Sequence, residues 1–177
     1  MAINPDEFRA VLGRFASGVT VLTARGKDGR DHGMTVSAFC SASLVPPLVV
    51  ACVAHDADMH GVLRKATHFG ISILAEGQEL LSDHFAGRPS NGLDVQFVRR
   101  QDMPVLKGAV AYLICEVADA HPAGDHTLYI GQVEYLEMWD SRPLVFYAGQ
   151  YRYLDVERLK QPQWPEDGYS LFSITNF

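Results

Sequence analysis

The stretch from Gly33 to Ala54 restricts the possible folds of this chain more than any other segment. It begins with β-branched and small hydroxyl residues, passes through Pro46–Pro47, and ends in an unbroken apolar run over residues 47–54. The first part predicts a strand over residues 31–38, followed by a loop of small hydroxyl residues and a proline turn. The apolar run predicts a second strand, buried on both faces. Exposed backbone and hydroxyl groups at the rim of such a sheet can hydrogen-bond a flat ligand, so this region is a candidate binding site.

Patterns elsewhere predict mostly strands, with three helices between them. Asn4 is a good helix cap, and Pro5 and the acids after it suit a first turn, so a helix is expected to about Phe15. A hairpin turn is expected at 26–29. Further strands are expected over 18–24, 69–75, 109–120, 126–139 and 144–147, and further helices over 58–66 and 76–86.

Six or seven strands in hairpin succession do not form a βαβ pattern, and no Gly-x-Gly-x-x-Gly follows a first strand. The expected fold is therefore α+β and mainly β: an antiparallel Greek-key barrel with flanking helices. Residues 1–160 are expected to form one domain. Residues 161–177 read as a C-terminal extension whose apolar end packs on the barrel or on a partner subunit.

Composition excludes several classes of protein. The 177 residues carry a formal charge of −6, and Arg99–Arg100 is the only adjacent arginine pair, which argues against a nucleic-acid surface. No apolar run has the length of a membrane span, and no secretory signal is visible, so a cytoplasmic location without membrane attachment is expected. The three cysteines are widely spaced in apolar sequence and are expected to be free, buried thiols.

Motifs for other chemistries are missing. His55 and His60 lie near two aspartates, but their spacing is not that of a His-Glu-x-x-His zinc site, and no metal is expected. Neither a Gly-x-Ser-x-Gly elbow nor a Walker-type phosphate loop occurs.

Several fragments together point to one family. The run from Gly33 to Ala54, which contains the Gly-x-Thr-x-Ser segment, is followed about 70 residues later by Gly124-Asp125-His126, at the start of a long strand with Gly131-Gln132-Val133. Between them, residues 80–88 contain Leu-Ser-x-x-Phe-Ala, and Pro143-Leu144 precedes two tyrosines. Over roughly residues 8–154 the chain resembles the short-chain flavin reductases, FMN-binding split-barrel proteins that hand reduced flavin to partner monooxygenases.

The resemblance implies specific site residues. His126 matches the family histidine beside the flavin, associated with nicotinamide binding, and is the expected catalytic residue. The implied cofactor contacts are Met34, Thr35, Val36, Ser37, Ser41, Ala51, Cys52, Val53, Ala54, Phe85, Ala86, Arg88, Tyr147 and Tyr151. After the second strand the family commonly has serine or threonine near the flavin phosphate, whereas this chain has residues 55–60, His-Asp-Ala-Asp-Met-His. Two acids there would repel a phosphate, so the phosphate contacts stay open.

The implied function is transfer of a hydride from NADH or NADPH to FMN or FAD, with the reduced flavin passed to a flavin-dependent monooxygenase. The family also implies a homodimer. Two alternatives remain: a split-barrel carrier or sensor with tightly bound FMN or haem, and an oxidase of a small substrate, related to the pyridoxamine-phosphate oxidase architecture.

Overall fold

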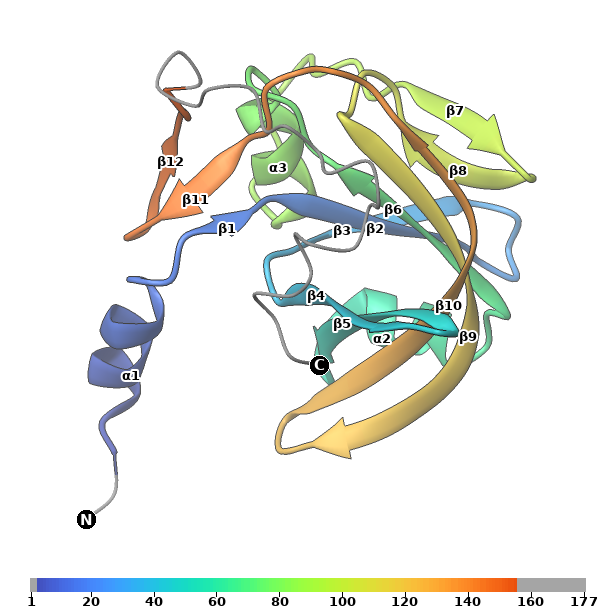
Figure 1. Ribbon diagram of the computed structural model, residues 1–177, viewed down its shortest axis with the longest axis horizontal. Coiled ribbons are helices and arrows are strands. Elements are labelled where there is room, and N and C mark those ends of the chain that lie inside the picture. The colour runs from blue at the N-terminus through green and yellow to red at the C-terminus, as the bar shows by residue number, and fades with distance from the viewer. Residues whose placement is uncertain (1–2, 156–177) are drawn as a thin grey trace.

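A computed structural model describes residues 3–155, and a seven-stranded antiparallel sheet forms its centre. The sheet curves into a barrel (Figure 1). Its strand order is β3-β2-β6-β9-β10-β5-β4, so β3 and β4 lie at its two open edges. The strands are β2 Thr20–Arg25, β3 Asp31–Val36, β4 Phe39–Leu44, β5 Pro47–Ala54, β6 His68–Ile73, β9 Ala111–Ala123 and β10 His126–Met138. The predicted fold class, a mainly β antiparallel split barrel with flanking helices, is confirmed.

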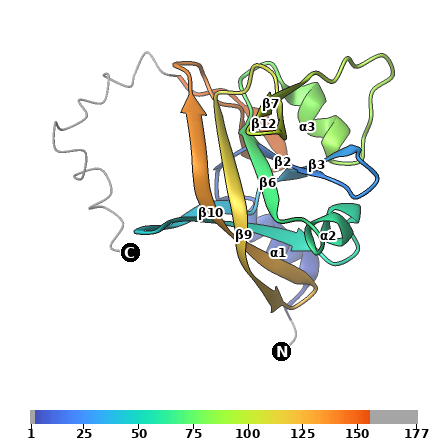
Figure 2. The ribbon, with the colours of Figure 1, turned by 90° about the vertical axis from the view of Figure 1, so that its right-hand side faces the viewer.

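Smaller elements surround the barrel. Helices α2 (Asp58–Leu63) and α3 (Glu79–Phe85) lie on either side of β3, as Figure 2 shows, and both contact β2 and β3. A separate sheet is formed by β1 (Ser17–Gly18), β11 (Val145–Tyr147) and β12 (Gln150–Arg152). The remaining elements are α1 (Pro5–Leu12), β7 (Phe97–Arg100) and β8 (Met103–Leu106).

The hydrophobic core fills the barrel and continues on the opposite face of β2. One cluster includes Leu22, Phe69 and Tyr129, each at most 1% exposed. Val21, the neighbour of Leu22, packs in a second cluster with Leu74. Because successive side chains of a strand point to opposite faces, β2 is buried on both sides over residues 20–24. Each large side chain buried in this way contributes about 2 kcal/mol to stability.

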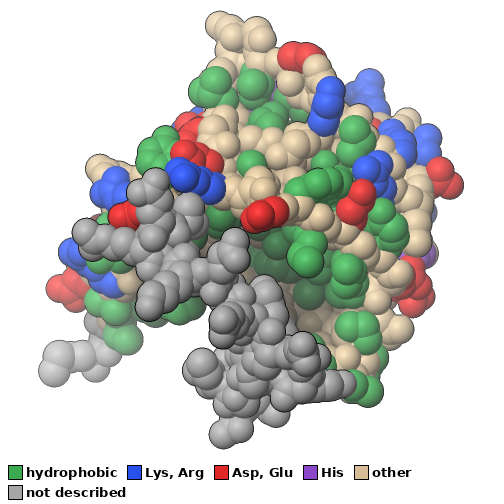
Figure 3. Space-filling model, turned by 45° about the horizontal axis from the view of Figure 1, so that its top comes forward, with side chains coloured by type: hydrophobic (Ala, Val, Ile, Leu, Met, Phe, Trp, Pro, Cys, Tyr) green, Lys and Arg blue, Asp and Glu red, His purple; other side chains and the backbone are tan. Residues whose placement is uncertain are grey.

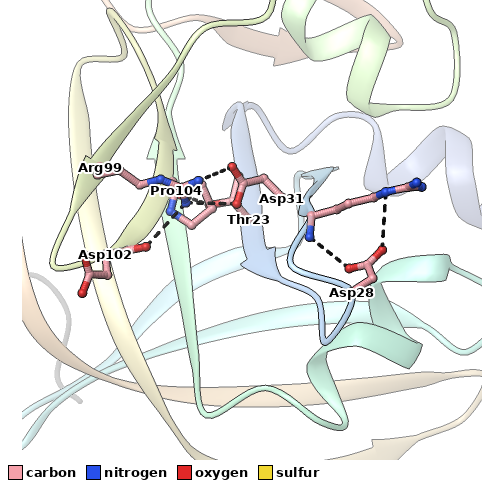
Figure 4. Close-up of polar contacts among 7 residues, drawn as sticks. Thr23, Asp28, Asp31, Arg99, Asp102 and Pro104 are labelled. Carbon is pink, nitrogen blue, oxygen red and sulfur yellow. Dashed lines mark hydrogen bonds and ion pairs between the residues drawn. The ribbon is translucent and has the colours of Figure 1, made fainter.

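Polar contacts attach the β7–β8 hairpin to the β2–β3 hairpin (Figure 4). The Arg99 guanidinium donates to both carboxylate oxygens of Asp31, at 3.0 and 2.6 Å. The Thr23 hydroxyl donates to the Pro104 carbonyl. Sequence pattern did not predict this hairpin, since arginines fill half of β7 and a proline interrupts β8.

The prediction that residues 47–54 are buried on both faces was wrong. Val49, Ala51 and Val53 are buried, while Val50 and Cys52 between them are only half-buried. Strand β5 lies next to the edge strand β4, and only its barrel side packs against the core.

Two further expectations about this region were also wrong. The loop expected after residue 38 is mostly a strand, β4, with a register shift between Ser41 and Ser43. The cysteines are free, as expected, but only Cys115 is buried; Cys52 is half-buried and Cys40 is exposed. Cys40 is exposed because it lies on edge strand β4.

Helix α1 begins as predicted but is not packed against the described chain. The Asn4 side chain accepts from the backbone N–H of Asp6 at 2.8 Å, as a capping residue should. The helix ends at Leu12 and contains no buried residue; Phe8 and Leu12 are 55% and 53% exposed. The other two predicted helices are likewise shorter than expected, at 58–63 and 79–85.

Residues 161–177, the expected C-terminal extension, lie outside the described residues. None of the helices within 3–155 is long and apolar enough to cross a membrane. On the face seen in Figure 3, acidic and basic side chains are interspersed rather than gathered by sign.

Candidate functional site

The open edge of β3 forms the base of the candidate site. Within residues 3–155, β3 pairs with β2 on one side and with no strand on the other. An edge strand leaves every second pair of backbone N–H and C=O groups without a partner in the sheet. The two residues after β3, Ser37 and Ala38, are exposed and connect it to β4 at the opposite edge. The strand that carries the Gly-x-Thr-x-Ser segment therefore has free backbone groups.

Two cavities lie along this edge and form one groove. The larger, of about 690 Å³, lies between β3, the start of α2 and the end of α3. Its lining residues are 31–35, 57–59 and 84–87. The smaller, of about 210 Å³, is lined by Val19, Thr35, Ser37, Ser82, Ala86, Arg88, Phe146 and Tyr151. Both cavities include Thr35 and Ala86, so we treat them as one site and name it the β3 groove.

Close packing of α3 on β3 fixes one wall of the groove. A Cβ atom built on Gly33 would lie 2.5 Å from Cε1 of Phe85, so the ring can approach the strand only because residue 33 has no side chain. The Thr35 hydroxyl donates to the Ser82 carbonyl at 2.7 Å. These contacts hold the Phe85 ring in place at the edge of β3.

A hydrogen-bond cluster closes the smaller cavity. The Tyr151 hydroxyl lies 2.9 Å from the Ser82 hydroxyl and 2.8 Å from an Asp83 carboxylate oxygen. Burial, together with the Asp83 carboxylate, raises the pKa of Tyr151. Arg88 donates to the same Asp83 oxygen at 2.5 Å, and this hydrogen bond raises the pKa of the guanidinium. Arg88 therefore lines the groove with its charge already paired.

His126 lies at the first position of β10, opposite Ala54 of β5. Its Nδ1 is 2.6 Å from the Asp125 carboxylate, and this hydrogen bond lowers the pKa of Asp125. Because the carboxylate accepts from Nδ1–H, the Nε2 atom takes no part in this hydrogen bond. The His126 side chain is 38% exposed and lines neither cavity of the groove.

The structure brings together about half of the residues that the sequence suggested. The groove lining includes Met34, Thr35, Ser37, Phe85, Ala86, Arg88 and Tyr151. Other suggested residues have core side chains and offer a ligand only their backbone: Val36, Ala51 and Val53. The remainder lie outside the lining of both cavities: Ser41, Cys52, Ala54, Tyr147 and His126.

Sequence reasoning missed several lining residues. In the sequence, residues 57–59 at the start of α2 stand out only as a departure from the family pattern. No sequence pattern marks His84, whose Nδ1 is buried and has no hydrogen-bond partner among residues 3–155. Gly33 was noted as part of a motif, yet a glycine inside a strand is itself a signal of close approach. No group of three potential metal ligands occurs in the part of the chain that the structure describes.

Comparison with known proteins gives a consistent result. The flavin reductase like domain family matches residues 12–155. An NADH-dependent flavin reductase from a Rhodococcus species is 46% identical over 162 residues, covering 90% of this chain and 92% of that protein. The reductase component of the Thermus thermophilus 4-hydroxyphenylacetate 3-monooxygenase is 44% identical over 84% of this chain and 96% of its own length.

Comparison with solved structures also finds flavin reductases. The native-state structure of the flavin reductase PheA2 superposes with a TM-score of 0.82 at 39% sequence identity, over 86% of this chain and 99% of that one. Since the family match extends from residue 12 to residue 155, it includes every strand of the barrel and every residue of the β3 groove. The chain belongs to the flavin reductase like domain family.

Proposed function

We propose that this protein is an NAD(P)H-dependent flavin reductase, which transfers a hydride from NADH or NADPH to FMN or FAD. Its reduced flavin would be consumed by the oxygenase component of a two-component monooxygenase, since the Thermus relative is the reductase component of such a system. The observation that carries the proposal is the β3 groove, which lies along an open strand edge and brings together about half of the suggested flavin residues from three separate segments.

The chemistry of the groove fits a flavin. The isoalloxazine ring is planar, apolar at one end and rich in hydrogen-bond donors and acceptors at the other. The free backbone groups of β3 and the Ser37 hydroxyl suit its polar end, and the rings of Phe85 and Phe146 suit its apolar part. The unpartnered Nδ1 of His84 adds a polar atom at the groove wall. Backbone of 51–54 and the residues near His126 would complete the surroundings.

The protein's own contribution is positioning. A bound flavin supplies the hydride acceptor, and hydride transfer requires donor and acceptor rings in near van der Waals contact. The β3 edge and Thr35 orient one ring, and Phe85 excludes water from it. Tyr151 and Tyr147 would border the nicotinamide side. His126, held by Asp125, would bind the nicotinamide through Nε2 or hold a proton there.

We further propose a homodimer, with the groove at or near the subunit interface. Helix α1 shows an apolar face to solvent, where Phe8 and Val11 are 55% and 67% exposed, and Phe15, just after the helix, is 79% exposed. Monomeric proteins seldom leave such a continuous apolar surface uncovered. We also propose a cytoplasmic location, since the thiols of Cys40, Cys52 and Cys115 are free, as expected in a reducing compartment.

The test is steady-state oxidation of NADH and NADPH by purified protein with riboflavin, FMN, FAD or no added flavin. Rapid oxidation that saturates with added flavin is expected. The same data give the preference between NADH and NADPH and the preference among the flavins. A coloured protein that oxidises neither nicotinamide in any mixture would contradict the proposal and indicate a carrier or sensor with bound cofactor.

A further inference from the structure

A third cavity continues the β3 groove beyond its open end. It has a volume of about 260 Å³ and lies between the β2–β3 hairpin and helix α2. Its lining residues are Arg25, Gly26, Lys27, Asp28, His32, Asp58, Gly61, Val62 and Lys65. His32 and Asp58 also line the larger cavity of the groove. We name this third space the hairpin cavity; it is the extension of the groove away from Tyr151.

The hairpin cavity has unpaired positive charge. Among residues 3–155, no ion pair or side-chain hydrogen bond is made by Arg25, Lys27 or Lys65. Arg25 ends β2, Lys27 lies in the turn after it, and Lys65 follows the end of α2. Arg88 differs, because Asp83 already binds its guanidinium. Cations of the hairpin cavity are thus free to bind an anion, whereas the cation of the smaller cavity is not.

The acidic residues of the hairpin cavity do not cancel this charge. Asp28 accepts from the backbone N–H of Arg30 at 3.1 Å and lies 3.5 Å from the His32 ring. These contacts, the backbone hydrogen bond first, lower the pKa of Asp28 and satisfy its carboxylate. Asp58 lies at the junction with the β3 groove, where a carboxylate can accept hydrogen bonds from sugar hydroxyls. The order along the site is therefore ring contacts, then a hydroxyl acceptor, then cations.

We propose, building on the flavin reductase function above, that the hairpin cavity binds the phosphate end of the flavin through Arg25, Lys27 and Lys65. A flavin has the same order of groups: a ring, a chain of hydroxyls, and then one phosphate in FMN or two in FAD. Cation–phosphate hydrogen bonds are among the stronger polar contacts in proteins. The cations replace the serine or threonine that the family commonly places after the second strand, where this chain has acids.

The experiment measures dissociation constants for riboflavin, FMN and FAD by flavin fluorescence quenching. The variants are Lys27→Gln, Lys65→Gln and the double substitution. Because the lysines are exposed, we expect a loss of affinity of roughly threefold for each and about tenfold together, for phosphorylated flavins only. Riboflavin, which lacks phosphate, should bind all variants equally. Higher ionic strength should weaken FMN binding in the wild type more than in the double variant.

Arg30→Gln is the matched control. It removes one positive charge from the same hairpin, but Arg30 does not line the cavity, and its guanidinium faces Asp28 at 3.9 Å. Its FMN affinity should stay near that of the wild type. An equal loss of affinity for FMN and FAD would assign the lysines to the first phosphate. A loss of affinity for FAD alone would assign them to the second. Either result supports the proposal.

Three results would overturn the phosphate-site proposal: unchanged affinity for FMN and FAD in the double variant, an equal loss of affinity for riboflavin, or an equal loss of FMN affinity in Arg30→Gln. A raised KM for NADH with riboflavin as acceptor, at unchanged FMN affinity, would also overturn it by assigning the lysines to the nicotinamide dinucleotide. These measurements separate the two proposals. Lysine-dependent FMN binding without NADH oxidation would contradict only the reductase function, and normal oxidation with lysine-independent binding would contradict only the phosphate site.

Discussion

The Phe85 ring of α3 lies directly against the backbone of Gly33 in β3, at a distance that leaves no room for a β-carbon. A Cβ at residue 33 would lie 2.5 and 2.6 Å from two atoms of the ring. Because α3 also holds Ser82, Asp83 and the cluster around Tyr151, displacement of Phe85 would disturb both cavities of the β3 groove.

Gly33→Ala is therefore expected to destabilise the protein by about 1–3 kcal/mol, the usual cost of overpacking, and to weaken flavin binding. Urea unfolding and flavin fluorescence titration measure the two effects. Adding Phe85→Leu in the same chain should recover part of the stability, since the smaller side chain gives the methyl group space. The stability control is Gly61→Ala in α2, where a Cβ meets nothing within 4 Å; this change should be neutral or stabilising. A Gly33→Ala protein as stable as the wild type would contradict the packing described here.

Replacement of His126 by alanine should lower turnover more than flavin affinity. If the imidazole binds nicotinamide or holds a proton, kcat/KM for NADH falls by up to about a hundredfold while the flavin dissociation constant changes little. His121→Ala is a matched control on the same β9–β10 hairpin. That histidine also pairs with an aspartate, at 3.0 Å from Asp119, and is exposed. Unchanged NADH kinetics in His126→Ala would remove His126 from the mechanism.

The barrel could be predicted from the sequence because its strands have local signals. The β2–β3 turn at 26–29 and the long β9–β10 hairpin follow from turn residues and period-two patterns, which depend on neighbours in the chain. The β7–β8 hairpin depends on distant partners, since Arg99 binds Asp31 and Thr23 donates to the Pro104 carbonyl. No local pattern encodes such contacts.

The site was predicted less completely for a similar reason. A family motif identifies Thr35 and Phe85 one residue at a time, but the groove exists only because α2 and α3 pack on either side of β3. The cations of the hairpin cavity show the same limit: Arg25 and Lys65 are 40 residues apart, and only the tertiary fold places them around one space.

The three thiols should react very differently. Burial raises the pKa of Cys115 to about 12, whereas Cys40 is exposed on an edge strand. A thiol reagent at neutral pH should modify Cys40 first and Cys115 only after unfolding, because the thiolate is the nucleophile. Mass spectrometry of a partly modified sample identifies the site. Modification of Cys115 ahead of Cys40 in native protein would contradict the described burial.

Ionisation of Cys115 also makes stability depend on pH. The folded protein keeps this proton to about pH 12, whereas the unfolded chain releases it near the ordinary pKa of 9.0. Between these values the unfolded state binds fewer protons, so the free energy of unfolding falls as pH rises. Cys115→Ala removes this contribution, and its unfolding free energy should fall less steeply than that of the wild type between pH 9 and 12. Parallel curves would indicate that the thiol ionises equally in both states.

The apolar face of α1 gives the sharpest test of the proposed dimer. Phe8, Val11 and Leu12 recur at helical spacing, and all three are more than half exposed on a helix that stands apart from the barrel (Figure 1). A face of this kind gains stability only when a second surface covers it. Leu12→Asp should therefore shift the protein from dimer to monomer in sedimentation equilibrium, since an unpaired carboxylate would be buried in the interface. Glu7→Ser, a change within the same helix at a charged position, should leave the mass unchanged. A wild-type protein that sediments as a monomer at micromolar concentration would contradict the dimer. If the protein is a dimer and Leu12→Asp leaves the dimer intact, then α1 is not the interface. The next surface to substitute would be the exposed apolar residues near the C-terminal end of β10, Leu136 and Met138.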